Sequence, residues 1–264
     1  MSSVARFVGS IPALYDRHLG PVLFEPYARE LAARVPSGAR QVLELAAGTG
    51  RLTRHLLAGL PSDGALIATD LNEPMLAEAQ RRVPADSRLR WQVADAQALP
   101  LGDATMDVVA CQFGLMFVPD KPRALREMRR VLRPGGMLLL STWDGLPRNP
   151  ATELLHALAC AELPADPPTF MLTPFSLPDP VALRALIAAA GFATIRVDTV
   201  AVVGEASSAA DLAVGFVRGN PLWNELVERG IDPAAFQARV EQALRDGFGD
   251  APCRTPLSAH VASC

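Results

Sequence analysis

The sequence predicts an α/β fold in which helices cover both faces of a doubly wound, mostly parallel sheet. Short apolar runs alternate with amphipathic stretches of about ten residues, which is typical of strands joined by crossover helices. The first run, 42–45, leads into a turn of small residues that ends at Gly50. The next run ends at Asp70, 20 residues later, the spacing of the ribose-binding acid in nucleotide-binding βαβ units. The chain is therefore expected to bind a cofactor that contains adenosine.

The first half of the chain is regular. Residues 21–35 predict an amphipathic helix with Pro21 near its start. Strands are predicted at 41–46, 65–70, 88–94, 106–112 and 136–143. Helices are predicted between them at 51–59, 73–83 and 121–132. Asn72 is placed to cap the second of these helices, and the Pro-Gly-Gly turn at 134–136 ends the third.

The second half is less regular. Residues 144–180 are rich in proline and are interpreted as an insertion on the substrate side, with a short helix near 151–161. A helix over 179–190 and a strand over 193–203 follow. Ser207 or Ser208 is expected to cap a helix that runs through Phe216. Two further helices near 221–229 and 233–246 lead to a last strand at 255–263.

Composition restricts the class of protein. Half of the 264 residues are hydrophobic, yet no apolar stretch approaches the roughly 20 residues that a membrane-spanning helix needs. The first residues lack the layout of a signal peptide. A net charge of −3 argues against nucleic acid as a partner. The four cysteines are scattered, without metal-ligand spacing, so we expect no metal site and a cytoplasmic protein. The oligomeric state stays open, with a homodimer as one alternative.

Several chemistry-bearing residues follow predicted strands. Glu44, Asp70, Asp95 and the Gln112-Phe113 pair lie at or near carboxyl ends. In open α/β sheets, ligands bind beyond these ends. The residue spacing therefore predicts that these side chains surround one site.

The turn that starts at Glu44, Glu-Leu-Ala-Ala-Gly-Thr-Gly, resembles motif I of class I S-adenosylmethionine-dependent methyltransferases. The usual pattern is Asp/Glu-x-Gly-x-Gly-x-Gly, and this chain has Ala46 where the first glycine usually stands. A carboxylate at Glu44 would repel a dinucleotide pyrophosphate, whereas the sulfonium and ammonium groups of S-adenosylmethionine would attract it. The chain also lacks the dinucleotide fingerprint G-x-G-x-x-G.

The resemblance covers about residues 38–145. Segment 93–101 is similar to the family segment whose acid receives the adenine amino group, which assigns Asp95 and the backbone of Ala96 to adenine. Segments 106–114 and 124–143 are similar to strand four, the following helix and strand five. The branch that these motifs resemble is the small-molecule one, which includes quinone-biosynthesis enzymes.

The resemblance implies a Rossmann-like, seven-stranded sheet whose last strand is antiparallel and lies between strands five and six. It also implies one methyltransferase domain over 1–264, with a helical lid at 1–35, a cofactor-binding core at 36–145 and helical cap insertions at 146–180 and 205–250. The cofactor would be S-adenosyl-L-methionine, with S-adenosyl-L-homocysteine as product. The residues expected to bind it are Glu44, Ala46, Gly48, Gly50, Asp70, Leu71, Met75, Asp95, Ala96 and Gln112.

The expected reaction is in-line methyl transfer to a small, fairly apolar molecule, driven mainly by proximity and orientation. Tyr15 is a candidate lid residue by family resemblance, and His18 a candidate general base; core packing and a surface position are the alternatives for these two residues. The acceptor pocket is expected to include Phe113, Met116, Phe117, Trp143, Phe170, Met171, Phe175, Phe216 and Trp223.

Two other functions stay open on the sequence alone. A non-catalytic module could bind S-adenosylmethionine with the same residues, because a fold does not determine a function. An NAD-dependent oxidoreductase would share the βαβ unit and Asp70.

Overall fold

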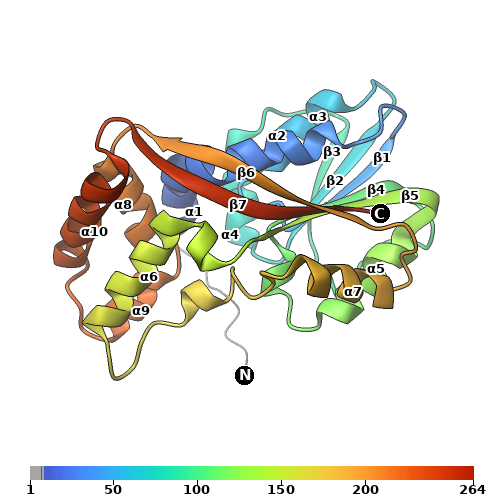
Figure 1. The fold of residues 1–264 in the computed structure, drawn as a ribbon. Coiled ribbons are helices and arrows are strands. Elements are labelled where there is room, and N and C mark those ends of the chain that lie inside the picture. The colour runs from blue at the N-terminus through green and yellow to red at the C-terminus, as the bar shows by residue number, and fades with distance from the viewer. Residues whose placement is uncertain (1–6, 8) are drawn as a thin grey trace.

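A seven-stranded sheet in the order β3-β2-β1-β4-β5-β7-β6 forms the centre of the computed structural model (Figure 1). The structure describes residue 7 and residues 9–264. The strands are β1 (Gln41–Leu45), β2 (Ala65–Asp70), β3 (Leu89–Val93), β4 (Met106–Gln112), β5 (Leu132–Trp143), β6 (Arg196–Ala206) and β7 (Cys253–Ser263). Strands β1 to β5 are parallel, and β7 runs antiparallel between β5 and β6. The predicted fold class and the position of the last strand are confirmed.

Helices connect and cover these strands. In chain order they are α1 (Ile11–Leu14), η1 (Tyr15–Phe24), α2 (Glu25–Ala33), α3 (Arg51–Gly59), α4 (Glu73–Arg82), η2 (Leu115–Phe117), α5 (Lys121–Val131), η3 (Leu146–Arg148), α6 (Pro150–Glu162), η4 (Phe170–Leu172), α7 (Pro180–Ala189), α8 (Ala209–Arg218), α9 (Leu222–Glu228) and α10 (Pro233–Phe248). Within the described part of the chain, no helix combines the length and the apolar character that a bilayer crossing requires.

The helices form two layers and a terminal group. Helices α2 and α3 pack on one face of the sheet, where Leu31 and Leu56 meet Val108. Helices α5 and α7 pack on the other face, where Leu125 and Ile187 share a core. Figure 1 shows α6, α8, α9 and α10 gathered at one end of the sheet, next to the extended strands β6 and β7. This group provides a wall on the side to which the parallel strands point.

The N-terminal helix differs from the prediction for 21–35. The helical path begins at Ile11, and Pro21 lies inside the π-helical segment η1 rather than near a helix start. Proline removes a backbone donor and crowds the carbonyl four residues earlier. The wider π turn relieves this crowding, since its carbonyls pair with the residue five positions on; the N–H of Glu25 donates to the carbonyl of Gly20. Long π segments are rare, and π turns are frequent at functional sites.

One of the two predicted helix caps is wrong. Asn72 precedes α4 but makes no capping hydrogen bond, because its amide is turned toward the Asp70 carboxylate, 3.4 Å away. Ser208 caps α8, and its hydroxyl accepts a hydrogen bond from the N–H of Asp211 at 3.0 Å. The exception therefore occurs where a neighbouring carboxylate competes for the capping side chain.

Candidate active site

The turn between β1 and α3 brings backbone close to the space beyond the sheet. Ala46, Gly48 and Gly50 all have positive φ, at 54°, 57° and 84°. A Cβ on Gly50 would lie 2.6 Å from Val83 of the neighbouring helix, so only glycine fits there. A Cβ on Gly114 would lie 2.3 Å from the Ala46 methyl. The methyl that replaces the usual glycine hydrogen at position 46 is thus accommodated by a glycine opposite it.

The Asp70 carboxylate ties the end of β2 to this turn. Its Oδ2 accepts a hydrogen bond from the N–H of Gly48 at 2.9 Å, and its Oδ1 accepts one from the N–H of Asn72 at 2.8 Å. Burial raises the pKa of Asp70. A carboxylate offers about four acceptor positions; with the Asn72 amide also directed at Oδ1, at 3.4 Å, Asp70 retains capacity for a donor from a ligand.

Glu44 is buried at the end of β1, and its Oε2 accepts a 2.6 Å hydrogen bond from the hydroxyl of Thr53. Burial raises the pKa of Glu44 to about 8. At neutral pH the Glu44 carboxyl is therefore protonated and uncharged in most molecules. The attraction between Glu44 and a cationic cofactor is therefore weaker than the sequence predicts. The hydrogen bond from Thr53 to Glu44 was not predicted from the sequence.

The remaining predicted cofactor residues lie along the edge formed by β2 and β3. Leu71 is 50% exposed directly after Asp70, whereas Met75 is buried and lies 3.7 Å from where a Cβ of Gly48 would stand. The Asp95 carboxylate accepts a hydrogen bond from the N–H of Gln97 at 2.8 Å. Ala96 packs at the border of the core. Leu71 follows β2, and Asp95 and Ala96 follow β3, so these residues lie near the carboxyl ends of two neighbouring strands.

A small, partly polar cavity opens directly at the glycine turn. The residues that line it come from η1, β1, the turn, α3 and the end of β4: Tyr15, Phe24, Glu44, Ala46, Ala47, Gly48, Thr49, Arg51, Leu52 and Gln112. We call it the turn cavity. The cavity lies beyond the carboxyl ends of the parallel strands, where open α/β sheets bind their ligands.

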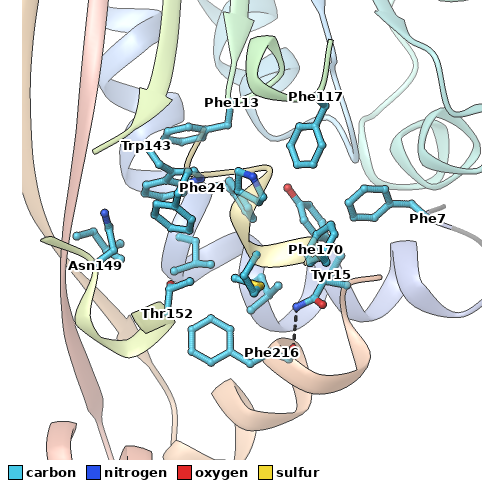
Figure 2. A pocket seen from close by; sticks show the side chains of 17 residues that line it. Phe7, Tyr15, Phe24, Phe113, Phe117, Trp143, Asn149, Thr152, Phe170 and Phe216 are labelled. Atoms are coloured by element: carbon cyan, nitrogen blue, oxygen red, sulfur yellow. Dashed lines mark hydrogen bonds between the residues drawn. The ribbon is translucent and has the colours of Figure 1, made fainter. Parts of the chain in front are cut away.

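A larger cavity lies beside it and is mainly aromatic (Figure 2). Seven of the predicted pocket residues line it, namely Phe113, Phe117, Trp143, Phe170, Met171, Phe175 and Phe216. Phe7, Tyr15, Leu19, Leu23, Phe24, Asn149, Thr152, Pro174, Asn220 and Leu257 complete it. We call it the aromatic cavity.

Stacked rings form one side of the aromatic cavity. Phe113 and Trp143 lie parallel with their ring centres 4.0 Å apart, and Figure 2 shows them across the cavity from Tyr15 and Phe170. Phe113 has a positive φ of 52°, a conformation that persists only where the surrounding structure holds it. The polar linings Asn149 and Asn220 are hydrogen-bonded to backbone groups.

Tyr15 and Phe24 line both cavities. Their rings stack with centres 4.8 Å apart, and they form the shared wall of the two cavities. Burial and the nearby Asp70 and Asp16 carboxylates raise the pKa of Tyr15, so its phenol is protonated at neutral pH and can donate a hydrogen bond. A ligand that fills the turn cavity therefore meets a ligand in the aromatic cavity at this wall.

Asp16 holds the shared wall against the glycine turn. Its Oδ1 accepts hydrogen bonds from the Thr49 hydroxyl at 2.9 Å and from Nε of Arg51 at 2.9 Å. The sequence alone predicts a role for Tyr15 but none for Asp16. Its position next to Tyr15 is a signal that could have drawn attention to it.

Six of the ten predicted cofactor residues line neither cavity, namely Gly50, Asp70, Leu71, Met75, Asp95 and Ala96. Three of the predicted catalytic and acceptor-pocket residues also lie outside both cavities. His18 is buried, with its Nδ1 2.8 Å from Asp211 of α8, an arrangement that suits a structural pair and gives no support for a general base. Met116 is buried in the core, and Trp223 packs beneath the guanidinium of Arg218. The type of side chain was the reason for predicting these residues. Whether a residue lines a cavity depends on the direction of its side chain, which its type does not reveal.

Comparison with known proteins gives consistent results. A family model described as a methyltransferase domain matches residues 43–140. The chain is 40% identical over 126 residues to the ubiquinone/menaquinone biosynthesis C-methyltransferase UbiE of Dinoroseobacter shibae, a match that covers 47% of this chain and 50% of that protein. It is 34% identical over 175 residues to UbiE of Escherichia coli K12, covering 60% of this chain and 70% of the relative. The chain thus spans about half the length of the first relative.

Solved structures share the fold. A proposed type II methyltransferase from Anaeromyxobacter dehalogenans superposes with a TM-score of 0.60 at 22% identity, over 92% of this chain and 96% of that one. A SAM-dependent methyltransferase from Thermotoga maritima superposes with a TM-score of 0.54 at 18% identity, over 98% and 96% of the two chains. At these identities the likeness shows the fold alone.

Proposed function

This chain belongs to the class I S-adenosylmethionine-dependent methyltransferases, and we propose that it transfers a methyl group from S-adenosylmethionine to a small apolar acceptor in the aromatic cavity. The observation that carries this proposal is the shared wall of Tyr15 and Phe24. Because these two residues line both cavities, the partly polar cavity at the glycine turn and the apolar cavity adjoin each other, and direct transfer needs its two reactants side by side.

The residues around the turn cavity fit S-adenosylmethionine. Gly48 leaves backbone bare at the turn cavity, and the side-chain carbonyl oxygen of Gln112 is buried without a hydrogen-bond partner among the described residues. We propose that the Asp70 carboxylate accepts hydrogen bonds from the ribose hydroxyls. Asp95 and the backbone of Ala96 would hold the adenine amino group, and the exposed Leu71 would cover the ring. The adenosine then lies toward β3, and the amino-acid part lies toward β4.

The protein contributes position and exclusion of water. When bound, S-adenosylmethionine supplies a methyl group on a sulfonium, and the displacement breaks that carbon–sulfur bond as the bond to the acceptor forms. Tyr15 and Phe24 would exclude water from the aromatic cavity, where the acceptor binds. Asp16 keeps their helix, η1, in place. Alignment of two bound reactants can supply much of the rate. The protonated Tyr15 phenol would act as a hydrogen-bond donor to the acceptor and not as a base.

The aromatic cavity favours an uncharged, planar acceptor. Rings line it on several sides, and none of the described residues that line it carries a charged side chain. Aromatic side chains prefer stacked or edge-to-face ring partners. The UbiE relatives are named for C-methylation in ubiquinone and menaquinone biosynthesis, and a ring of that general kind suits this lining.

Calorimetry tests the cofactor assignment. Wild-type protein should bind S-adenosylmethionine and S-adenosylhomocysteine and should not bind NAD⁺. Asp70→Ala should weaken binding of both by about 1–3 kcal/mol, as expected for the loss of hydrogen bonds to a charged group. Unchanged affinity in this variant would refute the ribose assignment, and binding of NAD⁺ in place of S-adenosylmethionine would favour an oxidoreductase.

A further inference from the structure

Five side chains with nitrogen or oxygen atoms line the aromatic cavity, namely Tyr15, Trp143, Asn149, Thr152 and Asn220. The amide of Asn149 donates to the carbonyl oxygen of Ser258 at 3.1 Å and accepts from the N–H of the same residue at 3.0 Å. The amide of Asn220 donates to the carbonyl of Phe216 and accepts from the N–H of Leu222. Backbone groups therefore hold both ends of the two amides, and the phenol, the indole and the threonine hydroxyl remain for a ligand.

The hydroxyl of Thr152 lacks the partner that a helix usually offers. Thr152 lies in the first turn of α6 and is only 6% exposed. A threonine hydroxyl in a helix commonly bonds the carbonyl three or four residues earlier. Here the backbone N–H of Thr152 donates to the carbonyl of Asn149 at 2.9 Å, while the hydroxyl makes no hydrogen bond to any described residue. A nearly buried hydroxyl without a partner is costly, so a ligand that pairs with it is favoured.

The Thr152 hydroxyl lies at the end of the aromatic cavity away from the turn cavity. Tyr15 lines both cavities, whereas Thr152 lines the aromatic cavity alone. Figure 2 shows Thr152 next to Asn149 on one side of the aromatic cavity and Tyr15 on the opposite side. Since the proposed methyl transfer occurs at the wall of Tyr15 and Phe24, a ligand group at Thr152 is remote from the reacting atoms.

We propose that Thr152 is a specificity-determining residue whose hydroxyl binds a polar substituent of the acceptor at the end away from the transferred methyl group. This inference rests on the proposed function and adds a property of the acceptor, namely hydrogen-bonding groups at two opposite ends of a planar molecule. The Tyr15 phenol pairs with one end and Thr152 with the other. The indole of Trp143 is a donor only, whereas a hydroxyl donates and accepts, so Thr152 takes either a hydroxyl or a carbonyl group.

Calorimetry with two planar probes tests this inference on the protein with S-adenosylhomocysteine bound. 2,6-Dihydroxynaphthalene carries a hydroxyl at each end, and 2-naphthol carries only one. Thr152→Val keeps the shape of the side chain and removes its hydroxyl. The variant should bind the diol about three- to tenfold more weakly, as expected for the loss of one uncharged hydrogen bond. Its affinity for 2-naphthol should change by less than about twofold, because the single hydroxyl can pair with Tyr15.

Two further variants serve as controls. Thr152→Ser keeps a hydroxyl at the same place and should retain the preference of the wild-type protein for the diol. Thr194→Val makes the same chemical change at an exposed residue that lines neither cavity, and it should leave both affinities unchanged. Urea denaturation adds a readout without a ligand. Because the hydroxyl of Thr152 is unpaired in the free protein, Thr152→Val should be at least as stable as the wild type.

The outcomes separate this inference from the proposed function. Equal losses for the two probes in Thr152→Val, or equal affinities of the wild-type protein for them, would overturn the inference alone. A less stable Thr152→Val variant would show that the hydroxyl is bonded within the protein and would also overturn it. Wild-type protein that binds neither probe would overturn the acceptor assignment of the aromatic cavity together with the inference. An absence of S-adenosylhomocysteine binding would overturn the proposed function and everything that rests on it.

Discussion

Ala46 and Glu44, two residues near the glycine turn, carry conformational or electrostatic costs. Ala46 adopts a left-handed backbone conformation that glycine usually occupies. Glu44 buries an acid whose charged form is disfavoured. Strain and perturbed pKa values of this kind gather at functional sites. Each of the two gives a prediction that can be tested on the purified protein.

Replacing Ala46 by glycine should raise the free energy of unfolding by about 0.5–1 kcal/mol. The left-handed conformation costs an L-residue about 1–2 kcal/mol, and glycine avoids this cost. Glycine also loses more backbone entropy on folding than alanine, which offsets about 0.5–1 kcal/mol of the gain. Urea denaturation measures the difference. Ala104→Gly is the matched control, since Ala104 has φ 53° in an exposed loop away from the cavities. A less stable Ala46→Gly variant would contradict this account of the turn.

Glu44→Gln should change how stability depends on pH. The pKa of Glu44 is raised to about 8 in the folded protein, so between about pH 4.5 and 8 the folded state holds a proton that the unfolded state has lost. Stability from this group is fully present below about pH 4.5 and falls as pH rises toward 8. The variant lacks this loss, and its advantage over wild type should grow with pH by up to about 1.4 kcal/mol per pH unit. Urea denaturation at pH 5, 6, 7 and 8 checks the trend, and parallel curves would refute it.

At the scale of elements, local patterns predicted the core well. The helix at 51–59 and the strands at 65–70 and 106–112 have the predicted bounds, because each alternates or repeats its apolar residues within its own length. Strand β6 lies at 196–206, three residues later than predicted. Its extent follows its pairing with β7, which continues to the pair of Ala206 with Cys253, and no local pattern contains that partner.

The N-terminal helix shows a second limit. A proline near the start of a helix is common, which favoured a start near Pro21. The π-helical segment that accepts Pro21 is held from outside, by the bonds of Asp16 to Thr49 and Arg51. These partners lie more than thirty residues away, so local periodicity could not predict them.

Asp16→Ala should therefore release η1 from the glycine turn. Removal of one partner from a buried ion pair costs about 3–5 kcal/mol, and we expect the lower end since Arg51 keeps Glu25 at 3.6 Å. Asp16→Asn retains an acceptor for Thr49 and should lose less stability. Urea denaturation gives the loss, and hydrogen exchange over residues 11–24 should show faster exchange.

A surface ion pair provides the control for Asp16. Asp63→Ala removes the partner of Arg40, in a pair where both side chains are more than half exposed. Such pairs contribute about 0–1 kcal/mol. An Asp16→Ala variant no less stable than Asp63→Ala would contradict the role given to Asp16.

At the scale of the whole molecule, the two cavities differ in how the chain builds them. Eight of the ten residues that line the turn cavity lie inside the matched family segment 43–140. Four of these eight, Glu44, Ala46, Gly48 and Gln112, are among the cofactor residues predicted from the sequence. The aromatic cavity draws on residues from Phe7 to Leu257, and only Phe113 and Phe117 of its lining lie within that segment. Thr152 and Leu257 had no recognisable signal, since an ordinary side chain becomes a cavity wall only through tertiary packing.

A crystal structure of the protein with S-adenosylhomocysteine tests the proposed function most directly. We expect the ribose hydroxyls to bind Asp70 and the sulfur to lie beside Tyr15 and Phe24, facing the aromatic cavity. That result would place the transferred methyl group of the cofactor at the acceptor site. A ligand whose sulfur faces away from the aromatic cavity, or whose ribose lies far from Asp70, would contradict the account.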